Sequence, residues 1–277
     1  MGETIMRARG RGERIGDIAL RLLLLFLVVF SLLPLITLSI FSVNDFPYYS
    51  LPFRGFTTHW YSELVRNQQI GPSLTISVQI ALGSAILATC LGGLFTMGAA
   101  RPGSKRLRWL LGLGFAPLVT PTLMIAIGLQ VLFVRIGLPL SPLTVIIGHV
   151  TTFTPLVVLV VSARLANFEW SLVDAARDLG AGPWTAFRTA VLPTIGPGLF
   201  SGFLITFLMS FNDFVIGFFT GRGFVTLPSL IYSMQRVGIS PMLLAYGTVL
   251  VIAALVAALT ARGALVGIAK KRGEVHV

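Results

Sequence analysis

One acidic side chain stands among aromatic residues in the stretch SFNDFVIGFF (210–219), where it could bind a cation. Asp213 is the acid, Asn212 precedes it, and Phe211 and Phe214 flank the pair. A carboxylate in the middle of a membrane span costs about 2.5–3.5 kcal/mol on insertion scales, so such groups usually face a cavity or a partner. Aromatic ring faces also attract ammonium groups. We interpret the stretch as a polar notch for a cationic solute. The alternatives are that Asp213 caps a broken helix or pairs with an arginine of another subunit.

The other side chains capable of chemistry stand alone. His149 lies in an apolar segment without a second His, Cys or acid at ligand spacing, so we expect it to be buried and hydrogen-bonded to a neighbouring helix rather than to bind a metal or carry protons. Cys90 is the single cysteine, which excludes an intrachain disulfide. Ser201, Thr206 and Ser210 fall in apolar segments and are expected to bond to preceding carbonyls. The sequence also lacks the phosphate-binding pattern G-x-x-x-x-G-K-[ST]. We therefore expect no catalytic residue, no metal and no cofactor bound by this chain.

A polar stretch, DAARDLGAGPWTAFRTAVLP (174–193), interrupts the apolar chain. Ser171 and Asp174 have the spacing of a helix start, in which the hydroxyl caps one end and the carboxylate reaches back. Gly180 permits a turn, and Pro183 can open a second helix with an amphipathic pattern. Pro193 is expected to end that helix before the next span. The stretch thus predicts a short helix, a glycine hinge and a second helix along the membrane surface.

This loop has two interpretations. It is either a solvated loop with an interfacial helix or a docking surface for another protein. Ala175, Ala176 and Gly180 would give a low-relief surface that a groove can approach closely, with Arg177 and Asp178 as charges at its rim.

The elements that must position these residues are membrane helices. Of the 277 residues 55% are hydrophobic and 11% are charged, whereas soluble domains are typically about 25% charged. Runs of about 20 apolar residues can cross a bilayer. Six spans are predicted, with an all-α fold: 20–41, 74–99, 108–133, 143–165, 195–219 and 244–268. Pro117, Pro121, Gly128 and Gly137 predict a kink in the third span, of the kind that lines a pathway.

The positive charges set the orientation of the chain. Its net charge of +11 could suit nucleic acid, but the Lys and Arg residues flank the apolar segments. Sixteen of the 21 lie toward the N-terminus as far as Arg21, in the 100–108 loop, in the 164–190 loop and toward the C-terminus from Arg262, and the remaining five lie on the other side. Both termini and the 174–193 loop are therefore predicted to be cytoplasmic. The first span resembles a signal peptide but is too long for one, so we expect it to be retained.

The order Asp-Ala-Ala, three residues, Gly, and a later Leu-Pro resembles the EAA signature of permease subunits of ATP-binding-cassette (ABC) importers. Asp174 stands where that family most often has Glu. The segments FTTHWYSELVRN (56–67), SPLTVIIGHVTTFTPLVVLVVSARL (141–165) and IYSMQRVGISP (231–241) are similar to the second permease of spermidine/putrescine importers. Together these segments cover most of the chain from the first external loop to the last span.

The resemblance implies a type I importer permease with a basic tail (1–19), a six-span domain (20–268) with a coupling loop (167–193), and a second tail (269–277). It implies a bacterial inner-membrane subunit that forms half of the translocation pathway. The expected partners are an ATPase dimer that carries the Mg-ATP, a second permease in a heterodimer, an extracytoplasmic solute-binding protein and membrane lipids, but no nucleic acid. The implied docking residues are Asp174, Ala175, Ala176, Arg177, Asp178, Gly180 and Ala181.

The same resemblance makes a polyamine or another small amine the expected solute, with Asp213, Asn212, Phe211, Phe214 and Thr122 along its pathway. Thr122 stands where polyamine permeases often carry an acid, and Leu244 where they tend to have Asn. Another small organic ion or an opine-like solute therefore remains open. From other classes, a secondary transporter or channel would show internal repeats and more intramembrane charge, and a membrane enzyme would need a catalytic set.

Overall fold

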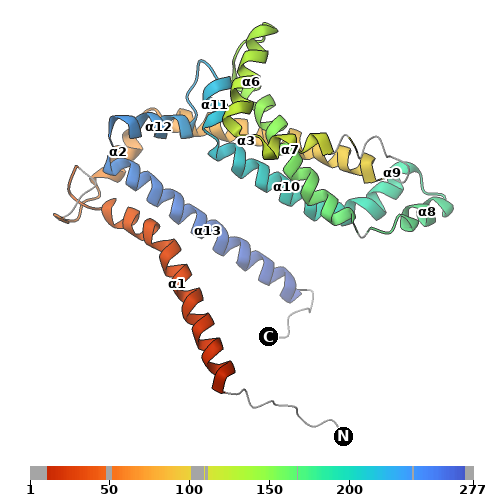
Figure 1. Ribbon diagram of the computed structural model, residues 1–277, viewed down its shortest axis with the longest axis horizontal. Coiled ribbons are helices and arrows are strands. Elements are labelled where there is room, and N and C mark those ends of the chain that lie inside the picture. The colour runs from red at the N-terminus through yellow and green to blue at the C-terminus, as the bar shows by residue number, and fades with distance from the viewer. Residues whose placement is uncertain are drawn as a thin grey trace. The chain divides into compact units, whose positions relative to one another are not determined.

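The computed structural model describes residues 11–47, 52–100, 109, 112–166, 168–238 and 240–271. Over these residues all regular elements are helical, and the only extended pairing is an isolated bridge between Asn44 and Phe56. The predicted all-α class is confirmed at this level. The chain forms two compact units, one of residues 1–67 with 234–277 and one of residues 68–233 (Figure 1).

Three long helices make the core of the second unit. They are α3 (Ile70–Ala100), α7 (Pro142–Leu165) and α10 (Leu192–Asn212), and each packs on the other two. Glycines let them approach closely. A Cβ on Gly92 would lie 2.9 Å from Val157, and one on Gly93 would lie 2.7 Å from Leu199. Small residues at helix contacts are how membrane helices gain packing, since burial gives them little hydrophobic energy relative to lipid.

The third predicted span is broken. One part covers Gly112–Val119, including α5 (Ala116–Val119), and α6 (Thr122–Arg135) follows at an angle of 110°. The break falls at Thr120–Pro121, where proline cannot donate the next helical hydrogen bond. The predicted kink in this span is confirmed.

The fifth predicted span, 195–219, is also broken, as in the alternative that has Asp213 cap a broken helix. Helix α10 ends at Asn212, Asp213 is extended with ψ of 122°, and α11 (Val215–Thr220) restarts two residues later. Helix α12 (Leu227–Val237) follows, and the backbone N–H of Leu227 donates to Ser77 Oγ of α3 over 2.8 Å.

The polar loop between α7 and α10 contains α8 (Ser171–Asp178), α9 (Pro183–Ala186) and the π-helical turn η1 (Phe187–Val191). Two predictions about it are wrong. Helix α8 begins at Ser171, so the predicted start is confirmed, but the N-cap position is Trp170, which is in a helical conformation and makes no side-chain capping bond, so Ser171 does not serve as the cap. Pro193 does not end the second helix, because the path stays helical from Pro183 to Asn212. The wide π turn lies where the proline ring would otherwise meet the preceding turn.

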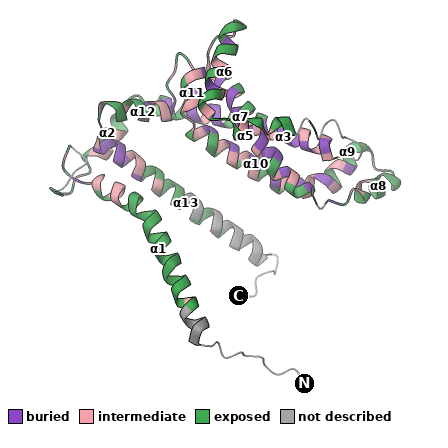
Figure 2. Ribbon diagram, in the orientation of Figure 1, coloured by how far each residue is buried: buried purple, intermediate pink, exposed green. Residues whose placement is uncertain are grey.

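The first unit consists of α1 (Arg11–Phe41), α2 (His59–Arg66) and α13 (Pro241–Lys271). Helix α13 packs on both α1 and α2. The loop after α1 is organised by Asn44, whose Oδ1 accepts from the Arg54 amide over 2.9 Å and whose carbonyl accepts from Trp60 Nε1 over 2.9 Å. Most of the described residues of α1 are exposed (Figure 2), and most of these are apolar, as expected for a helix that is covered by lipid or by another subunit.

Four of the described helices are long and apolar enough to cross a membrane, and the bent pair makes a fifth if it counts as one span. The four are Gly16–Phe41, Ile70–Ala100, Pro142–Leu165 and Pro183–Asn212. In α13 the described apolar segment, Pro241–Val256, is shorter than a span. The segment predicted as a basic tail is helical from Arg11 onward, and residues 1–10, 101–108 and 272–277 lie outside the described residues.

Candidate functional site

The end of α8 is closed by a glycine in a left-handed conformation. Gly180 has φ of +84°, and its amide donates to the carbonyl of Arg177 over 2.8 Å. The amide of Ala181 then reaches back to the carbonyl of Ala176 over 3.0 Å. These two bonds form a Schellman motif, which satisfies carbonyls that the helix end would leave unpaired. The turn thus requires a residue that tolerates positive φ at position 180.

The loop is anchored on the core of the second unit by apolar side chains. Phe168 and Val191, which flank the loop, are buried in one cluster with Val161 of α7. The rings of Phe168 and Trp170 meet edge to face with centroids 5.1 Å apart. Helix α8 packs on α9 and η1. This packing holds α8 at the end of the α3–α7–α10 core that lies away from α11 (Figure 1).

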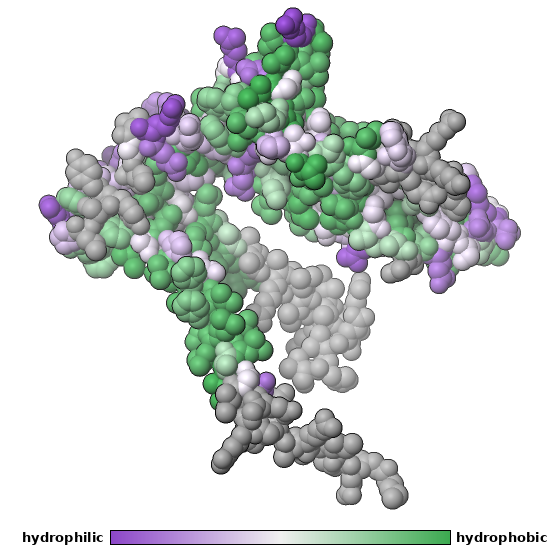
Figure 3. Space-filling model, viewed as in Figure 1, coloured by the Kyte–Doolittle hydropathy of each residue, from purple (hydrophilic) through white to green (hydrophobic). Residues whose placement is uncertain are grey.

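Between α8 and the η1 turn lies a groove of about 310 Å³. Asp174 and Arg177 line it, with the apolar side chains of Val173 and Phe187 among the walls. Figure 3 shows hydrophilic side chains gathered at this end of the second unit. The groove therefore combines charge with apolar surface.

Large apolar side chains stand exposed around this groove. Leu179 is 89% exposed and Trp184 is 69% exposed. Such side chains on a polar loop are characteristic of a contact surface. Of the predicted docking residues, Asp174, Ala175, Arg177, Asp178 and Gly180 are exposed, and Ala176 and Ala181 are partly buried.

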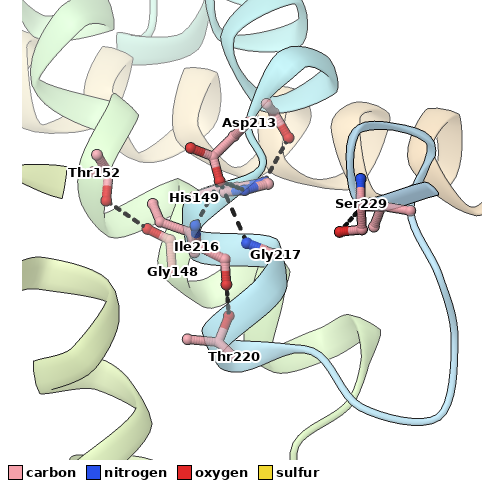
Figure 4. Close-up of polar contacts among 10 residues, drawn as sticks. Gly148, His149, Thr152, Asp213, Ile216, Gly217, Thr220 and Ser229 are labelled. Carbon is pink, nitrogen blue, oxygen red and sulfur yellow. Dashed lines mark hydrogen bonds and ion pairs between the residues drawn. The ribbon is translucent and has the colours of Figure 1, made fainter. Parts of the chain in front are cut away.

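The predicted solute residue Asp213 lies at the break between α10 and α11. Its Oδ1 accepts from the backbone N–H of Ile216 over 2.7 Å and from that of Gly217 over 3.3 Å, so it caps the start of α11. The same oxygen lies 3.3 Å from His149 Nε2 of α7. Figure 4 shows these contacts meeting on one carboxylate oxygen. In the part of the chain that the structure describes, Oδ2 makes no such contact.

His149 continues this network to α10. Its Nδ1 lies 2.6 Å from Ser210 Oγ, and the residue is 1% exposed. The expectation of a buried histidine bonded to a neighbouring helix is confirmed. Ser210 was expected to bond to its own helix, but its described bond goes to His149 instead. The Ser–His–Asp order resembles that of hydrolases, yet Ser210 is only 4% exposed, so a substrate could not reach it.

The aromatic residues near Asp213 divide into two groups. The ring of Phe214 lies beside the break, tilted against the ring of Tyr232 with centroids 4.3 Å apart and against that of Phe218 with centroids 5.1 Å apart. Phe211 instead continues a stacked row along α10, 6.1 Å from Phe207. Tyr232 was missed by the sequence analysis because it comes from α12, and no local pattern connects α12 to Asp213.

The remaining predicted pathway residues have local roles. Asn212 is exposed, and its Nδ2 donates to the carbonyl of Leu208 over 2.9 Å. Thr122 is the first residue of α6, partly buried, and none of the hydrogen bonds around Asp213 involves it. Among the described residues no three His, Cys, Asp or Glu side chains come together as a metal-binding group.

Comparison with known proteins identifies the family. Residues 88–266 match the family described as "Binding-protein-dependent transport system inner membrane component". The chain is 34% identical over 225 residues to the spermidine/putrescine transport system permease protein PotC of Escherichia coli K12, covering 81% of this chain and 85% of that protein. It is 36% identical over 238 residues to the putrescine transport system permease protein PotI of the same strain, covering 82% and 84%.

Solved structures share the fold at low sequence identity. A bacterial ABC transporter involved in the import of alginate matches with a TM-score of 0.68 and 15% identity, covering 92% of this chain and 97% of that chain. The methionine ABC transporter MetNI matches with a TM-score of 0.58 and 18% identity, covering 72% and 95%. The chain therefore belongs to the family of binding-protein-dependent transport system inner membrane components, as a permease subunit of an ABC importer that is homologous to the spermidine/putrescine permeases.

Proposed function

We propose that this permease couples ATP hydrolysis on a separate ATPase dimer to the passage of a small organic cation. The observation that carries the proposal is the geometry of the α8 loop. A glycine-closed helix, anchored on the core, presents small residues, two exposed apolar side chains and a charged groove. Such a surface suits another protein better than it suits water. A second permease subunit would complete the pathway, and an extracytoplasmic binding protein would deliver the solute.

The proposed orientation follows from the charge distribution. With 16 of 21 Lys and Arg residues on one side, both termini and the α8 loop lie in the cytoplasm, where the ATPase is. The proposal includes a sixth span along α13 and insertion in the bacterial inner membrane, the location that the family description names.

The proposed solute is a polyamine or another small amine. Its support is the similarity to PotC and PotI, together with the carboxylate of Asp213 next to the Phe214–Tyr232 ring pair. A carboxylate and ring faces are the groups that bind an alkylammonium. Thr122 stands where polyamine permeases often carry an acid, and Leu244 where they tend to have Asn. These two positions favour, as the second candidate, another small organic ion or an opine-like solute.

Reconstitution of the complete importer tests both parts of this proposal. The tagged chain would be purified from native membranes, the proteins that accompany it identified, and the complex placed in proteoliposomes with Mg-ATP inside. We expect an ATPase with a phosphate-binding loop to copurify. We expect uptake of labelled putrescine to require ATP and to be competed by spermidine but not by an opine.

Two results would change the assignment. Uptake without any copurifying ATPase would indicate a secondary transporter or channel. ATP-dependent uptake that an opine competes and spermidine does not would select the second solute class.

A further inference from the structure

We propose that His149 and Ser210 are positioning residues that hold one oxygen of the Asp213 carboxylate so that the other faces the cationic group of the solute. The inference rests on the proposed function, since it requires a cationic solute. It concerns two residues that would act through Asp213 without touching the solute.

The two oxygens of the Asp213 carboxylate differ in their hydrogen-bond partners. Oδ1 accepts from the amides of Ile216 and Gly217 and lies 3.3 Å from His149 Nε2. A carboxylate oxygen has about two lone-pair sites, so these three groups already fill Oδ1. Oδ2 has no partner among the described residues. A cation that approaches Asp213 therefore meets Oδ2. The direction in which Oδ2 points is set by the three groups that contact Oδ1 (Figure 4).

The two ring nitrogens of His149 have different partners, which sets the orientation of the ring. When Nε2–H donates to Asp213, Nδ1 must accept, and Ser210 Oγ is placed to donate to it over 2.6 Å. One neutral tautomer thus satisfies both contacts. His149 is 1% exposed and Ser210 is 4% exposed, so neither can reach a solute. Their contribution must pass through the carboxylate.

Helix α11 is attached to α7 by contacts that do not involve His149. Thr144 Oγ1 donates to the carbonyl of Thr220 over 2.7 Å at the far end of α11. A Cβ on Gly148 would lie 2.6 Å from Ile216, which shows how closely the two helices pack. Substitution of His149 therefore leaves α11 attached to α7. It changes the direction in which the Asp213 carboxylate points.

The variants that test this proposal each remove one of the two contacts of the His149 ring. His149→Gln places an amide nitrogen near the position of Nε2 and can still donate to Asp213. His149→Asn is shorter, so it can reach Ser210 but not Asp213. Ser210→Ala removes the group that orients the ring. The complete importer carrying each variant would be assayed in proteoliposomes for putrescine uptake, and the assembled complex would be quantified.

We expect His149→Asn to raise the KM for putrescine by about fivefold or more, the change that loss of one hydrogen bond produces. The maximal rate and the amount of complex should stay within about twofold of wild type, because Asp213 still caps α11. Ser210→Ala should raise KM in the same direction, and His149→Gln should stay near wild type. A purely structural role would instead lower the maximal rate or the amount of complex, without a difference between Gln and Asn.

Asp213→Asn serves as the reference. If it raises KM while His149→Asn and Ser210→Ala do not, the positioning role is wrong and the cation contact stands. If it leaves putrescine uptake unchanged, the cation contact fails, and the positioning role fails with it. Equal loss of assembled complex in both His149 variants would likewise overturn the proposal.

Discussion

The amide of Ala181 donates to the carbonyl oxygen of Ala176 over 3.0 Å, and this bond links the last turn of α8 to the segment before α9. It can form because Gly180, which stands between them, has φ of +84°. The turn directs the chain from α8 into α9, so the spacing of glycine after the Asp-Ala-Ala sequence has a geometric reason. Leu179, directly before Gly180, is exposed next to this turn.

The first prediction concerns this turn. A side chain at position 180 must enter the left-handed region, at a cost of roughly 1–2 kcal/mol for most residues and more for a β-branched one. We expect Gly180→Val to unwind the end of α8 and to abolish ATP-dependent uptake. Gly180→Asn is the matched control, because Asn tolerates this conformation, and it should keep a large part of the activity. Equal uptake in both variants would show that the Schellman turn is not required.

The second prediction concerns the sign of charge along α8. Asp174 lies in the first turn and lines the groove with Arg177. Asp174→Arg would place two positive charges in the groove and one at the positive end of the helix dipole. We expect binding of the ATPase to weaken by at least about tenfold.

Asp178→Arg, on the same helix, is the control for the second prediction. Asp178 lies in the last turn, where a positive charge favours the helix dipole, and it is not among the residues that line the groove. Copurification of the ATPase with each variant from membranes of equal expression gives the comparison. Because the resemblance makes Asp178 a docking residue as well, an equal loss in both would mean that the charged surface of α8 as a whole, and not the groove, determines docking.

The third prediction tests the packing of the core. Gly92→Ala would place a Cβ 2.9 Å from Val157 and 3.3 Å from the carbonyl of Thr154. Overpacking of this kind costs about 1–3 kcal/mol. We expect the purified complex to lose its folded fraction at a lower temperature in detergent. Gly71→Ala, on the same helix but with open space around its Cβ, should leave that temperature unchanged or raise it.

The local features of the chain could be predicted from sequence because neighbouring residues determine them. Pro117 and Pro121 predicted the break in the third span, since proline removes a helical donor wherever it stands. Gly180 predicted the end of α8 for a similar reason. Ser171 correctly marked the first residue of α8, but its predicted capping role is wrong. A helix start also depends on where the preceding backbone turns, and Trp170, packed on Phe168, already has helical dihedral angles.

The network around Asp213 could not be predicted in the same way. His149 and Ser210 are 61 residues apart, and they meet only because particular faces of α7 and α10 pack together. Helices α7 and α10 are apolar around most of their circumference, so no periodic pattern marks the packed face. The break after Asn212 lacks a proline or a glycine, and the alternative of a capping role for Asp213 was open but could not be chosen.

The fourth prediction tests the orientation. A reporter enzyme that is active only outside the cytoplasm should be active when fused after residue 220, which follows α11, and silent when fused at residue 182, between α8 and α9. The physical reason is the excess of positive charge on the side of the termini and of the α8 loop. The reverse pattern would place that loop away from the ATPase and would rule out its coupling role.

The last prediction separates the charge of Asp213 from its role as a helix cap. Asn accepts backbone hydrogen bonds at a helix start about as well as Asp, so Asp213→Asn keeps the start of α11 and removes the negative charge. If Oδ2 binds an ammonium group, a charge-assisted hydrogen bond worth roughly 1.5–3 kcal/mol is lost, and putrescine uptake should fall by roughly ten- to a hundredfold.

Two further measurements on the same membranes identify the alternatives for Asp213. If the carboxylate pairs with an arginine of the second permease, Asp213→Asn should lower the amount of assembled complex and spare solute preference. If it is only a cap, Asp213→Asn should behave as wild type. Asp213→Ala, which removes cap and charge together, should then cost stability of about 1 kcal/mol at the start of α11. Because Oδ1 already serves the cap and His149, and Oδ2 has no partner among the described residues, the contact between Oδ2 and the ammonium group is the outcome we expect.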